Sequence, residues 1–153
     1  MREITHGYFS EISADLASRV ELLCYTCGKG TLSEAEKQQL AELSSNCDAI
    51  VSIERPSVNP TGSYMTMRAI DIIGLTSEFD QYLFPQVGKP KFNPNQALIS
   101  IGDGGNEVGM GYVIDKVKEF IPNGDKICAN TVCDHLLVSD TSNFGGYALC
   151  NAM

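Results

Sequence analysis

The chain has 153 residues, of which 43% are apolar and 20% charged, a composition typical of one ordinary globular domain. Its formal net charge of −8 argues against nucleic acid or an anionic membrane as a partner. No apolar run reaches the roughly 20 residues of a bilayer span, and the first residues resemble neither a secretory nor a transit signal. Six scattered cysteines indicate reduced thiols in an intracellular protein that is not secreted.

The first 47 residues read as a helical lead-in. Ser33 followed by Glu36 forms a capping box, which predicts a helix running to about Ser45. Between this helix and an earlier one, Cys24 and Cys27 form a lone C-x-x-C pair, for which a structural role is favoured over a zinc or redox site. The earlier helix is predicted from apolar residues at helical spacing, namely Phe9, Ile12, Leu16, Val20 and Leu23.

Three short apolar runs, at residues 48–53, 97–99 and 136–138, predict strands, and the β-branched run at 48–53 suits a buried parallel strand. Helical patterns at 79–84 and 112–120 lie between them, and a last helix is expected after the third run. This βαβ order predicts a parallel sheet of the α/β class. We expect a three-layer, Rossmann-like parallel sheet flanked by helices, incomplete because it has three strands.

The stretch after the second predicted strand carries the most distinctive chemistry. The sequence SIGDGGNEVGMG at residues 100–111 places five glycines within ten residues, which lets a ligand approach the main chain closely. The helix that follows directs N–H groups toward an anion or a developing oxyanion. Asp103 and Glu107 instead suggest a metal, an ammonium group or acid–base chemistry. The alternative, a purely structural turn, explains Glu107 but needs fewer glycines.

Charged residues also mark the end of the first predicted strand. Glu54 and Arg55 follow it directly, and the carboxyl ends of parallel strands are where α/β proteins bind ligands. A salt bridge between these two neighbours is the competing interpretation. Arg68 lies on a segment, residues 64–73, that is predicted to be helical or irregular. His135 would enter the third strand rather than leave it, so a structural role is favoured.

Together these blocks resemble the D-glutamate cyclase family. The glycine loop is similar to that family's signature, and two further blocks occur in the same order, AIVSIERP with GSYMTMR (49–56 and 62–68) and CDHLLV with SNFGGYAL (133–138 and 142–149). The family more often has glycine where this chain has Ala69. Its domain is longer than this chain, so we expect a partial copy: one α/β domain over residues 1–153, with the lead-in at 1–47 and the matching blocks at 48–153.

The resemblance implies conversion of D-glutamate to 5-oxo-D-proline and water, a lyase reaction. It also implies the mitochondrial matrix, where animal members are expected, or otherwise the cytoplasm. Asp103 and Glu107 would be the catalytic base and acid. Arg55 or Arg68 would bind the α-carboxylate of the substrate. The N–H groups of Gly104 and Gly105 would bind the oxyanion, and Asn106 and Asn143 would orient the substrate by hydrogen bonds.

Three alternatives stay open at this point. Mg²⁺ or Mn²⁺ held by Asp103, Glu107 and Glu54 could act as a Lewis acid, with Asp134 as a further ligand. A non-catalytic fragment could bind the ligand or form a homo-oligomer through exposed helix faces. A nucleotide-phosphate site is disfavoured because the loop has no basic residue.

Overall fold

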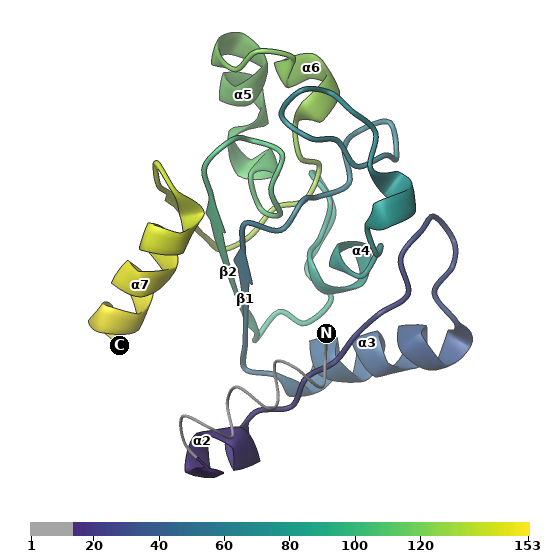
Figure 1. Ribbon diagram of the computed structural model, residues 1–153, viewed down its shortest axis with the longest axis vertical. Coiled ribbons are helices and arrows are strands. Elements are labelled where there is room, and N and C mark those ends of the chain that lie inside the picture. The colour runs from purple at the N-terminus through teal and green to yellow at the C-terminus, as the bar shows by residue number, and fades with distance from the viewer. Residues whose placement is uncertain (1–13) are drawn as a thin grey trace.

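A computed structural model describes residues 14–153, and its centre is a three-stranded parallel sheet (Figure 1). The strands are β1 (Ala49–Ile53), β2 (Ala97–Gly102) and β3 (His135–Val138), in the order β1-β2-β3. In the register, Ile101 lies opposite both Ile53 and Leu137. The carboxyl ends of all three strands therefore meet at one edge, and the predicted parallel α/β sheet is confirmed.

The helices before the sheet are α2 (Ala14–Arg19) and α3 (Glu34–Asn46). The capping box of α3 is confirmed, because Ser33 and Glu36 each accept the other's backbone N–H. The first helix was predicted to reach Leu23, but α2 ends at Arg19. One reason is that Glu36 also accepts the N–H of Thr26 at 2.7 Å, which holds the preceding chain in an irregular path beside α3. The predicted helical positions Phe9 and Ile12 lie outside the described residues.

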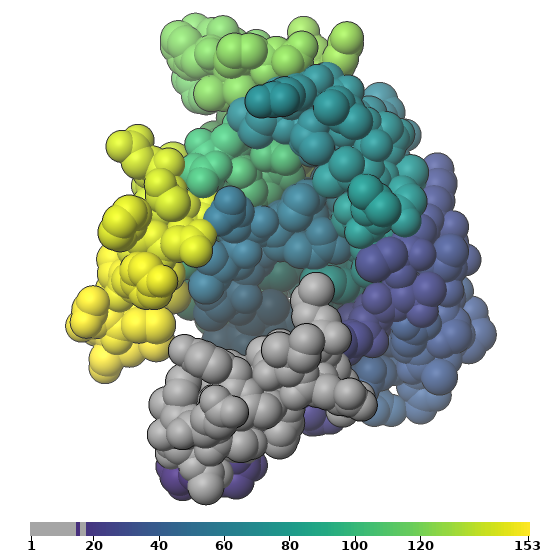
Figure 2. All heavy atoms as spheres, in the orientation of Figure 1, coloured from purple at the N-terminus to yellow at the C-terminus, as the bar shows by residue number. Residues whose placement is uncertain are grey.

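Helix α7 (Ser142–Ala152) packs on one face of the sheet. Two glycines bring it close, since a Cβ added to Gly145 would lie 2.5 Å from Ile101 Cγ2 and one added to Gly146 would lie 3.3 Å from Ile53 Cδ1. The cover is partial, because Val51 and Ile53 remain 45% and 48% exposed. Figure 2 shows the blue segment that includes β1 reaching the surface beside the yellow α7.

The opposite face of the sheet holds the apolar core, which includes side chains from α4 (Asp80–Leu83) and from the loop after β2. Turn η1 (Ile73–Leu75) precedes α4, and β2 is followed by η2 (Gly111–Val113), α5 (Ile114–Phe120) and the unpredicted α6 (Gly124–Ile127). Within residues 14–153, no helix has the length and apolar character of a membrane span. The core residues are Phe84, Leu98, Val108 and Cys133, with Ile50, Leu83 and Leu136 packed against them.

A buried carboxylate ties the crossover after β1 to α4. Asp80 is 1% exposed and accepts the N–H of Val58 at 3.1 Å and the hydroxyl of Tyr64, which is itself fully buried. Burial raises the pKa of Asp80, although these hydrogen bonds oppose the rise. Because an unpaired buried carboxylate would be costly, this arrangement fixes the segment that leads into the following hairpin.

Residues 65–71 form that hairpin. Of the two alternatives expected for residues 64–73, a helix or an irregular segment, the structure therefore shows the irregular one. Met65 and Asp71 bridge as an antiparallel pair, and the Ala69 N–H donates to the Thr66 carbonyl at 2.8 Å. Ala69 has a φ of 57°, in the left-handed region. A three-residue hairpin loop ends in such a residue, and glycine is favoured there because it has no Cβ.

Ala69→Gly should raise the free energy of unfolding by about 1 kcal/mol, because it relieves the strain of alanine at positive φ. Urea denaturation followed by circular dichroism measures the change. Gly62→Ala is the matched control: Gly62 has a φ of 81° and open space around an added Cβ, so strain alone should lower stability by a similar amount. A loss of stability in Ala69→Gly would contradict this account of the turn.

Candidate active site

The glycine loop, residues 102–111, begins at the carboxyl end of β2 and is held on both sides by main-chain hydrogen bonds. One flanking segment follows β1 and the other precedes β3. The loop is therefore a fixed part of the fold rather than a free turn. The bonds run from the N–H of Ser57 to Asn106, of Val108 to Arg55, of Ala129 to Gly105 and of Gly111 to Thr131, at 2.8–3.0 Å.

The loop's glycines make room for the chain's own side chains. A Cβ added to Gly105 would lie 2.6 Å from Val117 Cγ1, and one added to Gly104 would lie 2.5 Å from Met67 Sδ. At Gly109 it would lie 2.3 Å from Ser100 Oγ. All three distances are shorter than real Cβ atoms show. Internal packing is thus a second reason for glycine at these positions, beside the close approach of a ligand.

Glu107 folds back onto the start of its own loop. Its Oε1 accepts the N–H of Gly104 at 3.0 Å, and its Oε2 accepts the N–H of Gly105 at 2.8 Å. The residue is 5% exposed. Burial raises the pKa of Glu107, and the neighbouring Asp103 carboxyl acts in the same direction, while the two N–H groups oppose it. Glu107 is therefore suited to hold a proton that it can give away.

Asp103 lies in a different environment from Glu107, although the two share one turn. It is exposed at the carboxyl end of β2, and its Oδ2 accepts the N–H of Ser142, the first residue of α7, at 3.2 Å. The positive end of the α7 dipole favours a carboxylate at this place. An exposed, oriented carboxylate beside a buried one is an arrangement that supports base and acid roles.

A cavity of about 280 Å³ adjoins Asp103 and the two glycines whose N–H groups bind Glu107. Asp103, Gly104 and Gly105 form one wall of it, and α5 side chains that include Lys116 and Val117 form another. Most of the lining is apolar. Lys116 was not among the sequence candidates, although its helical spacing from Val113 and Phe120, which line the same cavity, would have placed it on this face.

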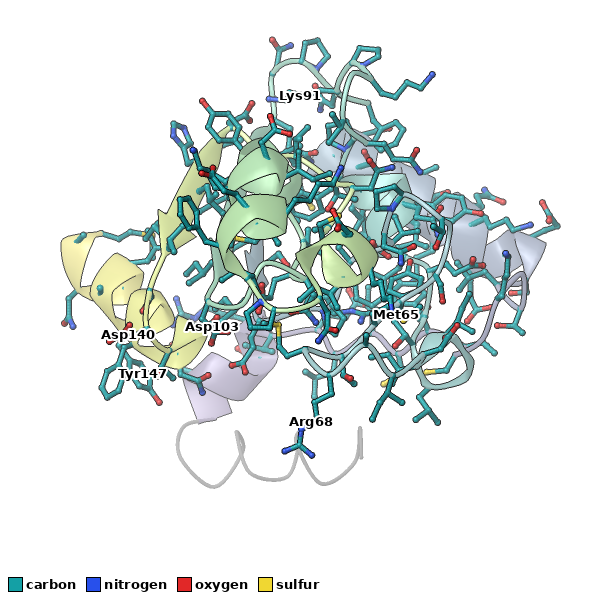
Figure 3. All side chains as sticks on the ribbon, turned by 90° about the horizontal axis from the view of Figure 1, so that it is seen from above. Met65, Arg68, Lys91, Asp103, Asp140 and Tyr147 are labelled. Atoms are coloured by element: carbon teal, nitrogen blue, oxygen red, sulfur yellow. The ribbon has the colours of Figure 1, made fainter. Side chains whose placement is uncertain are left out.

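The candidate arginines lie in different surroundings. The Arg55 guanidinium donates to the Ser77 carbonyl at 2.6 Å and stacks over the Phe79 ring at 4.5 Å, beside a separate cavity. Burial lowers the pKa of Arg55. Arg68, at the tip of the hairpin, extends outward from the molecule (Figure 3). Its neighbour Met67 lies over Gly104.

The remaining candidates, Asn106, Asn143 and Glu54, differ in burial and in their contacts. Asn106 is buried and donates its side-chain N–H to the Met65 carbonyl at 2.8 Å, which fastens the hairpin to the glycine loop. Asn143 is exposed in the first turn of α7, next to the Ser142 that binds Asp103. Glu54 is exposed and has a φ of 51°, a strained conformation of the kind found at functional sites.

The donors for a divalent metal do not converge in this arrangement. Within residues 14–153, no three His, Cys, Asp or Glu side chains form a group that could hold an ion. Both oxygens of Glu107 already accept N–H groups. Asp134, the further candidate, is paired with Lys91 at 2.7 Å. The carboxylates as placed therefore do not fit a metal site.

These features define an α/β protein with a candidate acid–base site at the carboxyl edge of a parallel sheet. Residues 10–153 match the family described as D-glutamate cyclase-like, C-terminal. The chain belongs to this family.

A named relative is the mitochondrial D-glutamate cyclase of Homo sapiens, which is 35% identical to this chain over 106 residues. The match covers 69% of this chain and 17% of the human protein. The chain thus spans a small part of that relative.

The raised pKa of Glu107 predicts a pH-dependent stability. A carboxyl whose pKa is higher in the folded than in the unfolded state favours folding while protonated. Stability should therefore fall as pH rises from the unfolded value, about 4.3, to the folded one, by at most about 1.4 kcal/mol per pH unit. In Glu107→Gln this contribution should be absent.

Chemical denaturation of both proteins between about pH 4 and pH 8 tests this. The difference in unfolding free energy, native minus variant, should decrease with pH and then level off. Glu42→Gln, at an exposed position on α3, serves as the control and should follow the native curve. A difference that stays constant or rises with pH would contradict the assignment.

Proposed function

We propose that the chain is a D-glutamate cyclase that converts D-glutamate to 5-oxo-D-proline and water. The observation that carries the proposal is the Asp103 and Glu107 pair, one exposed and the other buried with a raised pKa. Family membership and the name of the human relative support the substrate. The same relative supports placement in the mitochondrion, with the matrix as the proposed compartment and secretion not expected.

The proposed reaction forms a bond between the amine nitrogen and the side-chain carboxyl carbon, and it breaks a carbon–oxygen bond. Asp103 accepts a proton from the amine so that nitrogen can attack. Glu107 donates a proton to the departing oxygen. In total, two protons move from nitrogen to that oxygen, which leaves as water, and no net proton is released.

Substrate binding is proposed for the surrounding candidates. Arg68 can reach an anionic group from the hairpin tip, and Asn143 can orient it from α7. The N–H groups of Gly104 and Gly105 can receive an oxyanion only when Glu107 moves off them, because they bind its carboxylate in this structure. Arg55 would have to leave Ser77 and Phe79 to take part.

The test is incubation of the purified chain with D- or L-glutamate and detection of 5-oxoproline by mass spectrometry. Product is expected from D-glutamate, and Asp103→Asn should abolish it because the base is lost. Asp115→Asn, an exposed acidic residue on α5, is the matched control and should keep full activity. Parallel samples with Mn²⁺, Mg²⁺ or a chelator test the metal alternative. Unchanged activity in Asp103→Asn would contradict the proposal.

A second candidate function is a non-catalytic module that binds the ligand or associates with itself. The exposed Val51, Ile53, Phe144 and Tyr147 favour it, since such apolar groups promote association. A well-folded chain that forms no 5-oxoproline but binds D-glutamate, or sediments as a dimer, would support this function over the first.

The contact between α7 and Asp103 gives a further prediction. Ser142→Pro should lower kcat/KM for D-glutamate at least about tenfold, because it removes the N–H that orients Asp103. Proline is well tolerated at the first position of a helix, and Thr141 already has the extended conformation that a following proline requires (φ −143°, ψ 119°).

Ser142→Ala keeps the N–H and should retain near-native activity. Thermal melting of both variants confirms that each is folded. Equal activity of folded Ser142→Pro and Ser142→Ala would show that the hydrogen bond does not matter.

A further inference from the structure

The structure offers an unassigned cation beside the candidate active site. A substrate with an α-carboxylate needs a positive group close to Asp103, yet Arg55 is occupied by Ser77 and Phe79 and lines a different cavity. Lys116 is the basic residue among those that line the cavity formed with Asp103 and the two glycines. Arg68 does not line this cavity, so within the lining the position for the α-carboxylate is at Lys116 on α5, and Arg68 is left for the second carboxylate.

Lys116 is available for such a ligand. Its Nζ pairs with Glu119 at 2.7 Å, but both side chains are largely exposed, at 68% and 53%. Exposed pairs of this kind contribute little, so a ligand carboxylate can replace Glu119. The Nζ also lies 5.3 Å from the centre of the Phe120 ring, and both residues line the cavity.

The rest of the cavity fits the remaining parts of a small amino acid. Asp103 offers a carboxylate to an ammonium group, and Met110 and Val117 offer an apolar surface to methylene groups. An acidic, an apolar and a basic contact thus line one space of about 280 Å³. Contacts of three kinds around one carbon centre are also what discrimination between mirror-image ligands requires.

We propose that Lys116 binds the non-reacting α-carboxylate of a short amino dicarboxylate whose ammonium group lies at Asp103. This inference rests on the proposed function for the identity of the substrate. Lys116 is then a specificity-determining residue rather than a catalytic one. Its interaction is made equally in the ground state and in the transition state, so its loss should raise KM more than it lowers kcat.

The test compares three α5 variants with the native chain by calorimetric titration of D-glutamate and by steady-state kinetics. Lys116→Met keeps the aliphatic stem and should weaken binding about two- to fivefold, with a parallel rise in KM. Glu119→Gln frees Lys116 and should tighten binding a few-fold. Lys118→Met removes an exposed charge outside the cavity and should change neither value.

A ligand series locates the contact. 4-Aminobutyrate lacks the α-carboxylate, so its affinity should be the same for the native chain and Lys116→Met. Glutarate lacks the amine and should bind more weakly than D-glutamate, but Asp103→Asn should improve its binding by removing the repulsion.

The outcomes separate this inference from the proposed function. If the native chain binds D-glutamate without converting it, and Lys116→Met weakens this binding, the Lys116 site is supported and the proposed cyclase activity is contradicted. Turnover with equal KM in Lys116→Met and Lys118→Met overturns the role of Lys116 and leaves the cyclase standing. Absence of D-glutamate binding by the native chain also overturns it.

Discussion

The candidate site depends on one contact, the Glu107 carboxylate bound to the N–H groups of Gly104 and Gly105. It closes the loop on itself, so the acid is positioned by the main chain rather than by another side chain. Because the Glu107 side chain turns back toward the start of the loop, a Cβ at Gly104 would meet both the Glu107 carboxylate and the Met67 side chain. The same closure removes Glu107 from water, and burial then raises its pKa. Loop shape, glycine identity and proton affinity therefore have a common cause.

Around this contact the fold supplies fixed supports from segments far apart in the sequence. The chain after β1 and the chain before β3 hold the loop by main-chain hydrogen bonds, and the first residue of α7 holds Asp103. The hairpin is attached to the glycine loop through the hydrogen bond from Asn106 to Met65, and Arg68 at its tip points outward (Figure 3). Because these supports are mainly backbone groups, the geometry tolerates many side-chain changes outside the loop.

The sequence predicted what local spacing determines. The capping box of α3, the three parallel strands and the position of the glycine loop follow from short patterns within single segments. The sequence did not predict the direction of the Arg55 side chain, which stacks on Phe79. The preceding residue, Glu54, has a φ of 51°, and a non-glycine residue gives no sign of such a conformation in the sequence. Lys91 bonds to Asp134, which lies 43 residues away in the sequence. Such pairings depend on tertiary contacts that no periodicity encodes.

The hydrogen bonds that hold Asp103 and Glu107 do not involve the exposed strand β1. All the groups that hold Asp103 and Glu107 lie between the end of β1 and the start of α7, within the described residues. Part of the exposed apolar surface lies on β1, where α7 covers the sheet only in part, and among the described residues β1 pairs with β2 alone. An open strand edge with exposed Val51 and Ile53 favours association. Changes to that edge should therefore act on solubility and assembly first, because none of the hydrogen bonds that shape the acid–base pair passes through it.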